Sequence, residues 1–172
     1  MKDFAANWKM MKACGFPRGA YHFVVPKRDG LSQARQFLEI LAGDYGELPH
    51  ALDLERPIGC QDECCGRPCY HWRALTKAWI DEVERVTKRR VAIYTTEPFY
   101  IKCMCATPKF ADSPLWLAAW PKFDFPEQMR WGGWSKWTFY HYLGNKRFNG
   151  GVIDVDLFNG DEDAFAAFLG NI

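Results

Sequence analysis

The segment Asp53-Leu54-Glu55 brings together two carboxyl groups that could act on a glycosidic bond. It ends a short apolar run over residues 50–55, which we expect to be a β-strand. Residues two apart on a strand face the same side, so Asp53 and Glu55 point one way and Leu54 the other. Neighbouring carboxyl groups push each other's pKa apart, so one can act as an acid while the other stays charged. Glycoside hydrolysis needs such a pair, although two solvated acids at an exposed strand end would give the same pattern.

A second pair of carboxyl groups occurs in Asp154-Val155-Asp156, within a strand expected over residues 152–157. By the same alternation Asp154 and Asp156 share one face of that strand. Asp154 is therefore a further candidate for the site. For Asp156 we favour a capping role at the helix that follows.

Aromatic residues are unusually frequent, with 8 Trp, 7 Tyr and 13 Phe. Trp and Tyr rings serve sites for flat or amphipathic ligands such as sugars, but they also pack in cores. We expect core packing for about half of the rings in the densest stretch. That stretch contains Trp116, Trp120, Trp131, Trp134, Trp137, Phe139, Tyr140 and Tyr142.

The chain has seven cysteines, an odd number, so at least one has no partner within the chain. Their spacing in the loop over residues 56–69 is C-x3-C-C-x3-C, unlike the usual zinc knuckles. Two or three disulfides, a zinc site and unlinked thiols all remain open. Cys14 is expected to be buried on the first helix. The others are Cys60, Cys64, Cys65, Cys69, Cys103 and Cys105.

Length and charge narrow the class of protein. The 172 residues fit a single domain over residues 1–172. The net charge of +1 gives no electrostatic case for a nucleic-acid partner. No apolar run approaches the roughly 20 residues of a membrane span. The first residues lack the apolar region of a signal peptide.

The elements that must position these residues alternate along the chain. We expect helices over residues 3–14, 30–42, 70–89 and 162–169. Strands are expected over residues 19–25, 50–55, 91–95, 115–120, 137–142 and 152–157. This alternation predicts parallel β/α units, and six strands are too few for an eight-stranded barrel. His22, within the first strand, is expected to be a hydrogen-bonded core residue.

Taken together, these segments resemble glycoside hydrolase family 25, the muramidases that cut the glycan of peptidoglycan. The resemblance runs from Asp3 to about Gly160. It includes the stretch from Gly15 to Phe23, the D-x-E strand, Pro114-Leu115-Trp116-Leu117-Ala118, Trp137-Thr138-Phe139 and Ile153-Asp154-Val155-Asp156-Leu157-Phe158-Asn159-Gly160. Each segment alone is weak evidence, but their order and spacing match the family.

The resemblance implies an irregular TIM-like β/α barrel that hydrolyses the β-1,4 bond between N-acetylmuramic acid and N-acetylglucosamine. Glu55 would be the proton donor, Asp53 its partner and Asp154 a second aspartate of the site. The substrate's own N-acetyl oxygen would act as nucleophile, oriented by Asp53. Tyr21 and Tyr94 would face the substrate, and Trp116 and Trp137 would form the sugar platform.

The resemblance also implies partners and location. Peptidoglycan glycan strands would be the partner of a monomer that uses no cofactor and no metal. The protein would be secreted or delivered by a phage to the cell wall. Whether it is an autolysin or an endolysin is left open.

The chain departs from the family in three places. The family's first two strands, the first of which carries another aspartate, would precede Met1, so we expect an N-terminally incomplete barrel with about six of eight strands. Thr138 stands where the family usually has Gln, and the loop over residues 56–69 resembles an insertion. An inactive glycan-binding remnant of the same fold is therefore the alternative function.

Overall fold

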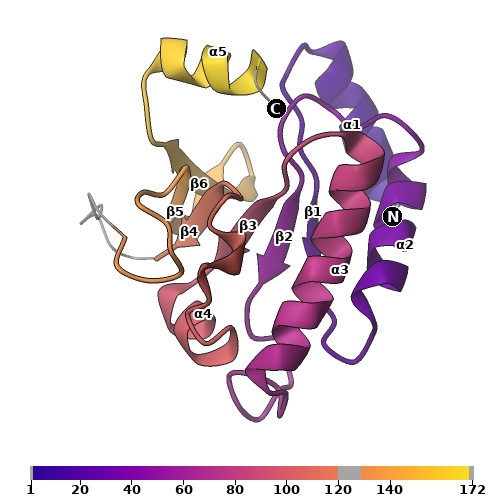
Figure 1. Cartoon of the computed structure of the whole chain (residues 1–172). Coiled ribbons are helices and arrows are strands. Elements are labelled where there is room, and N and C mark those ends of the chain that lie inside the picture. Colours follow the sequence, from indigo (N-terminus) through magenta and orange to yellow (C-terminus); the bar gives the residue numbers. More distant parts are fainter. Residues whose placement is uncertain (1, 120–128, 171–172) are drawn as a thin grey trace.

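The protein is a mixed α/β fold built on one curled six-stranded sheet (Figure 1). The computed structural model describes residues 2–119 and 129–170; Trp120 lies outside them. The strands follow chain order across the sheet: β1 (Tyr21–Phe23), β2 (Ala51–Leu54), β3 (Ala92–Thr95), β4 (Leu115–Ala118), β5 (Phe139–Phe148) and β6 (Gly151–Phe158). The helices are α1 (Lys2–Ala13), α2 (Gly30–Leu41), α3 (Cys69–Thr87), α4 (Glu97–Cys103) and α5 (Glu162–Gly170), with a short 3-10 helix at Pro108–Phe110.

The predicted β/α units are present in the first part of the sheet. Strands β1 to β5 pair in parallel, and α2 and α3 lie side by side along β1–β3 (Figure 1). Helix α2 begins where the Asp29 side chain accepts a 2.8 Å hydrogen bond from the Ser32 amide, and it buries Phe37 and Leu41 against the core. No helix in the described part of the chain combines the length and apolar character that a membrane crossing requires.

The last two strands differ from the prediction of parallel units throughout. Strands β5 and β6 form an antiparallel hairpin, and β5 starts at Phe139 and runs on to Phe148. Asn149 and Gly150 join them, both with positive φ, 46° and 80°. An Asn-Gly pair at positive φ is the preferred two-residue hairpin turn because its twist matches that of the strands.

Helix α4 was not predicted. It begins after Thr96, whose side chain accepts a hydrogen bond from the Phe99 amide, and Pro98 stands in its first turn. With seven residues it is too short to show a helical period. Phe99 and Cys103 of α4 are fully buried, so it closes one side of the core.

The main core lies between the sheet and helices α2 and α3. Trp72 and Trp79 of α3 are fully buried there. His22 stacks on Trp79 with ring centroids 5.7 Å apart, and its Nε2 lies 3.0 Å from Gln33 Oε1. The predicted hydrogen bond is confirmed, but His22 is half-buried at the border of the core; this burial lowers its pKa.

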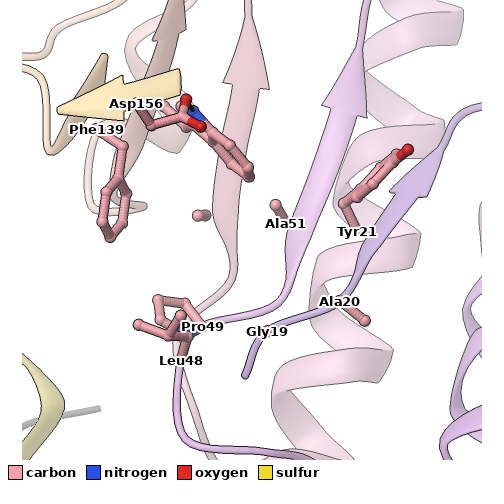
Figure 2. Close-up of a pocket in the computed structure, with 10 residues that line it drawn as sticks. Gly19, Ala20, Tyr21, Leu48, Pro49, Ala51, Phe139 and Asp156 are labelled. Atoms are coloured by element: carbon pink, nitrogen blue, oxygen red, sulfur yellow. Dashed lines mark hydrogen bonds between the residues drawn. The ribbon is translucent and has the colours of Figure 1, made fainter. Parts of the chain in front are cut away.

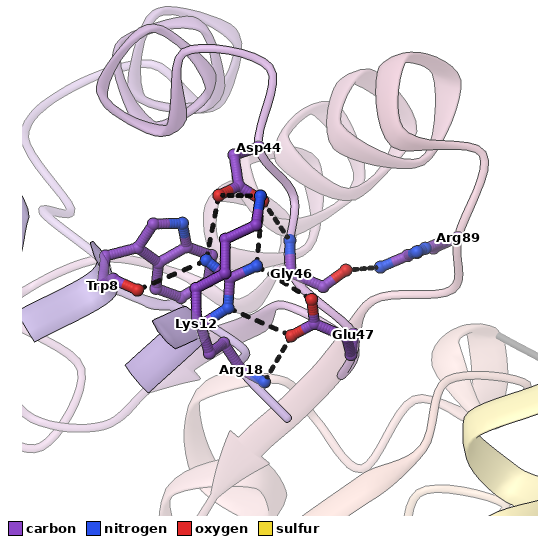
Figure 3. Close-up of polar contacts among 7 residues, drawn as sticks. All are labelled: Trp8, Lys12, Arg18, Asp44, Gly46, Glu47 and Arg89. Atoms are coloured by element: carbon purple, nitrogen blue, oxygen red, sulfur yellow. Dashed lines mark hydrogen bonds and ion pairs between the residues drawn. The ribbon is translucent and has the colours of Figure 1, made fainter. Parts of the chain in front are cut away.

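Helix α1 is attached to the rest of the fold by one buried guanidinium (Figure 3). Arg18 is fully buried and pairs with Asp44 at 2.9 Å and with Glu47 at 2.8 Å. Its Cζ lies 4.5 Å from the ring centroid of Trp8, and Nη1 donates to the Trp8 carbonyl oxygen. These bonds hold the pKa of Asp44 and of Glu47 below their ordinary values.

Six cysteines form three disulfides, which is one of the alternatives left open by the sequence. The pairs are Cys60–Cys65, Cys64–Cys103 and Cys69–Cys105. Cys64 lies in the loop after β2 and is bonded to α4, whereas Cys69 begins α3 and is bonded to the turn after α4. Cys14 is the free thiol among the described residues and is exposed, so the expectation that it is buried is wrong. Helix α1 turns Phe4 and Trp8 inward and ends at Ala13, which leaves Cys14 outside the core.

Candidate active site

A cavity of about 330 Å³ lies on the inner face of the curled sheet, and all six strands or the residues next to them contribute to it. The lining side chains are four carboxylic acids, one histidine and four aromatic rings. They are Tyr21, Phe23, Asp53, Glu55, Tyr94, Trp116, His141, Asp154 and Asp156. The structure thus brings together six of the seven predicted site residues.

Strand β2 positions the central carboxyl pair. Leu52 and Leu54 are fully buried in the core, while Asp53 and Glu55 line the cavity on the opposite face. Asp53 has only 6% of its surface exposed, which contradicts the alternative of two solvated acids. The Thr95 hydroxyl of β3 donates a 2.8 Å hydrogen bond to the Leu54 carbonyl oxygen and so fixes the backbone just before Glu55.

The pKa of each carboxyl group in this pair is raised. Burial raises the pKa of Asp53 to about 8, and the charge of Glu55 adds to the effect. Burial also raises the pKa of Glu55, with His141 acting in the opposite direction. Asp53 Oδ1 is buried and accepts no hydrogen bond from the described residues. An added hydrogen-bond donor at this oxygen would stabilise the charged form of Asp53.

A chain of polar contacts runs along one wall of the cavity. The Tyr94 hydroxyl lies 3.0 Å from His141 Nδ1, and His141 Nε2 lies 3.9 Å from Asp154 Oδ1. His141 is almost completely buried, whereas 63% of the Asp154 side chain is exposed. The sequence interpretation missed His141, because a single histidine in an aromatic strand carries no pattern of its own.

Asp156 belongs to the site rather than to a helix cap. It pairs with His141 across β5 and β6, and its Oδ1 accepts a 2.7 Å hydrogen bond from Trp116 Nε1. The residue that caps α5 is Asp161, which accepts from the Ala164 amide. The capping prediction for Asp156 is wrong because β6 continues to Phe158 and α5 begins only at Glu162.

Trp137 is the predicted site residue that the structure keeps away from the cavity. It is 5% exposed and packs its ring on Tyr140, with centroids 5.4 Å apart. Trp131 and Trp134 are also core residues, and both rings contact Tyr100. Of the predicted platform rings, Trp116 lines the cavity, and its ring meets Tyr94 edge-on at 5.2 Å.

An apolar hollow of about 240 Å³ lies at the N-terminal ends of the parallel strands and shares Tyr21, Trp116 and Asp156 with the cavity. Figure 2 shows Tyr21 and Asp156 on either side of this hollow, with Ala51 between them. Its remaining walls come largely from backbone and small or apolar side chains: Gly19, Ala20, Leu48, Pro49, Ala92, Trp116 and Phe139. Among the described residues, no group of three or more His, Cys, Asp or Glu side chains is arranged to hold a metal ion.

Comparison with known proteins defines the class to which this site belongs. The family model of glycosyl hydrolases family 25 matches residues 2–151. Lysozyme M1 of Streptomyces globisporus is 32% identical over 176 residues, and the uncharacterized protein YegX of Escherichia coli O157:H7 is 27% identical over 171 residues. Each alignment covers 98% of this chain and 58% of the relative, so the chain spans less than two thirds of their length. The chain therefore belongs to glycosyl hydrolase family 25.

Solved structures of bacterial and fungal enzymes share the fold. The bacterial lysozyme from Streptomyces coelicolor superposes with a TM-score of 0.83 at 29% identity, over 98% of this chain and 79% of that one. The muramidase from Acremonium alcalophilum gives a TM-score of 0.79 at 28% identity, over 98% and 80% of the two chains. Family membership and the α/β fold with six strands, both predicted from the sequence, are thus confirmed.

Proposed function

We propose that this protein is a muramidase that hydrolyses the β-1,4 bond between N-acetylmuramic acid and N-acetylglucosamine in peptidoglycan. The observation that supports this best is the buried carboxyl pair of β2. Asp53 and Glu55 line one cavity, and both have a raised pKa. Two coupled carboxyl groups that hold a proton near neutral pH are what an acid-catalysed glycoside hydrolysis requires.

Glu55 is the general acid in this proposal. It donates its proton to the glycosidic oxygen as the bond from that oxygen to the anomeric carbon breaks. The acetamide oxygen of the sugar that carries this anomeric carbon attacks the carbon, and a ring intermediate forms. Glu55 then takes a proton from water, which attacks the anomeric carbon and opens that ring. The net change is the addition of one water molecule across the bond.

Asp53 orients the acetamide group. The acetamide N–H would donate to Asp53 Oδ1, the buried atom that accepts no hydrogen bond from the described residues. A donor at that oxygen favours the charged form of Asp53. Because the charges of the two groups interact, a charged Asp53 would raise the pKa of Glu55, so substrate binding would favour the proton on Glu55, where it is needed.

The aromatic residues and the outer aspartates complete the proposed subsite. Trp116 is held by Asp156 and would present its ring to the apolar face of a sugar. Tyr21, which is 65% exposed, and Tyr94 would contact the sugar from β1 and β3. Asp154 would accept a hydrogen bond from a sugar hydroxyl at the exposed end of the cavity.

We further propose that the curled sheet is part of a TIM-like barrel that two more strands close between β1 and β6. Within the described residues β1 pairs with β2 alone and β6 with β5 alone. A location outside the cytoplasm, at the cell wall, fits the three disulfides, which persist in oxidising surroundings.

The test is release of reducing ends from purified peptidoglycan. The wild-type protein should release them, and Glu55→Gln should lower the rate by at least 10²–10⁴-fold because an amide cannot donate the proton. Glu39→Gln, an exposed site on α2, is the matched control and should keep full activity. Binding of peptidoglycan without reducing-end release by the wild-type protein would overturn the proposal in favour of a glycan-binding remnant.

A further inference from the structure

His141 brings the one basic side chain into a cavity otherwise lined by acids and aromatic rings. Asp53 and Glu55 face it from β2, Tyr94 from β3, and Asp154 and Asp156 from β6. Strand β4 contributes Trp116 and Ala118 on this side, neither of which carries a charge. A protonated imidazole among four carboxyl groups stabilises their ionised forms.

The contacts of the ring give it one preferred arrangement. Nδ1 lies 3.0 Å from the Tyr94 hydroxyl, and Nε2 faces Asp154 Oδ1 at 3.9 Å. In the neutral ring Tyr94 donates to Nδ1, and Nε2 turns its hydrogen toward the carboxylate. In the protonated ring both nitrogens donate, Nδ1 to the Tyr94 oxygen and Nε2 toward Asp154. The opposite tautomer would aim a lone pair at a negative charge, so it is disfavoured.

A β-bulge interrupts the pairing of β5 with β6 directly after His141. His141 pairs with Asp156, but the next pair along the ladder is Leu143 with Val155, so one extra residue of β5 forms a bulge directly after His141. The Asp154 Oδ1 atom then lies 3.4 Å from the backbone nitrogen of Asn145. Bulges of this kind re-aim side chains and occur next to active sites.

We propose that His141 is the positioning residue of this cavity: it holds the Tyr94 hydroxyl on one side and attracts Asp154 on the other, and in its protonated form it stabilises the ionised carboxyl groups that face it. The part of this inference that concerns turnover rests on the muramidase function proposed above. The part that concerns charge does not. In agreement with it, the charge of His141 lowers the pKa of Glu55 against the effect of burial.

Two variants separate the contacts of the ring. His141→Asn keeps an amide near the position of Nδ1, so the Tyr94 hydroxyl retains a partner, but it removes the charge and the Nε2 contact. His141→Phe keeps a ring and removes both. His71→Asn, at a histidine that contacts the Pro26 carbonyl outside the cavity, is the matched control. Thermal unfolding of each variant establishes that it is folded.

The deciding measurement is an NMR titration of the side-chain carboxyl carbon of Glu55, assigned with Glu55→Gln. Glu55 should titrate at higher pH in both His141 variants than in the wild type, and at the wild-type pH in His71→Asn. An unchanged Glu55 titration in both folded His141 variants would overturn the proposal. This readout needs no catalysis, so it stands even if the wild-type protein fails to release reducing ends.

If the wild-type protein hydrolyses peptidoglycan, kcat provides a second readout. Loss of one hydrogen bond to Tyr94 should lower kcat by about tenfold in His141→Phe. The fall should be smaller in His141→Asn, with KM nearly unchanged in both. The alkaline limb of the pH–rate profile should move to higher pH in both variants, because Glu55 then keeps its proton up to a higher pH. An equal fall in both variants without this pH shift would mean that His141 is only a packing residue, and the proposal would be wrong.

Discussion

Cys64 is disulfide-bonded to Cys103, 39 residues later, and this bond joins the loop that follows Glu55 to helix α4. Helix α4 in turn follows β3, the strand that carries Tyr94. Trp72 Nε1 donates a 3.0 Å hydrogen bond to the Cys64 carbonyl oxygen, so the same loop is also fixed to α3. The disulfide therefore connects the loop that follows β2, the strand of the carboxyl pair, with the helix that follows β3, the strand of the tyrosine.

Removal of this disulfide should cost stability. Cys64→Ala with Cys103→Ala opens a loop of about 40 residues and should lower the free energy of unfolding by about 2–4 kcal/mol. Urea denaturation measures the change. Cys14→Ala, at the exposed free thiol, is the control and should differ from wild type by less than about 0.5 kcal/mol. A thiol assay on the unfolded, unreduced wild-type protein should find Cys14 alone reactive; seven reactive thiols would contradict the disulfide assignment.

The raised pKa of Asp53 predicts a pH-dependent stability. The folded protein holds this proton up to about pH 8, whereas an unperturbed carboxyl releases it near 3.8. Between these values the folded state binds more protons than the unfolded state, so the free energy of unfolding falls as pH rises and levels off above about 8. Asp53→Asn removes the titrating group, and its free energy of unfolding should fall less over this range, with an advantage over wild type of more than about 1 kcal/mol at the upper end. Parallel curves for the two proteins in urea series at several pH values would refute this prediction.

The buried guanidinium of Arg18 should be a major contribution to the attachment of α1. Arg18→Met leaves Glu47 without this partner, leaves Asp44 with the exposed Lys12, and removes the stacking on Trp8 (Figure 3). Because the two carboxylates keep contact with water, we expect a loss of about 2–4 kcal/mol, below the upper end for a fully buried pair. Lys12→Met removes an exposed ion pair to the same Asp44 and should cost less than about 1 kcal/mol. If the two variants lose similar stability in thermal unfolding, burial of Arg18 does not strengthen its ion pairs.

The sequence was sufficient for those parts of the site that follow a regular period. Asp53 and Glu55 share a face because side chains alternate along a strand, and that alternation is visible in the buried Leu52 and Leu54. His141 also follows the regular alternation of β5, but a single histidine in an aromatic strand carries no pattern that marks it as a site residue. The bulge comes after it and changes which later side chains of β5 share its face. Trp137 and Trp116 look alike in the sequence, and only the packing against Tyr140 makes Trp137 a core residue.

Other features lay beyond the sequence for different reasons. Six cysteines can pair in fifteen ways, and spacing alone does not choose among them. The Asn149-Gly150 pair, in contrast, is a recognisable hairpin signal and would have predicted the antiparallel end of the sheet. Asp156 was assigned to a cap because helix starts favour Asp, whereas Asp161 occupies that position.

The proposed barrel can be tested at the two outer strands of the sheet, β1 and β6. Exposed apolar side chains lie on the terminal strands: Tyr21 on β1 is 65% exposed, and Val152 and Leu157 on β6 are 61% and 41% exposed. Strand edges without a partner invite pairing with other chains. A fusion that supplies the first two strand–helix units of a family 25 lysozyme before Met1 should therefore have a higher thermal midpoint, less aggregation and faster release of reducing ends than the 172-residue chain.

Light scattering, thermal unfolding and the peptidoglycan assay compare the fusion with the 172-residue chain. The control fusion carries the same units with glycines at the inward-facing strand positions, and it should gain neither stability nor activity. Equal midpoints and equal rates for the fusion and the 172-residue chain would show that the site needs no further strands between β1 and β6.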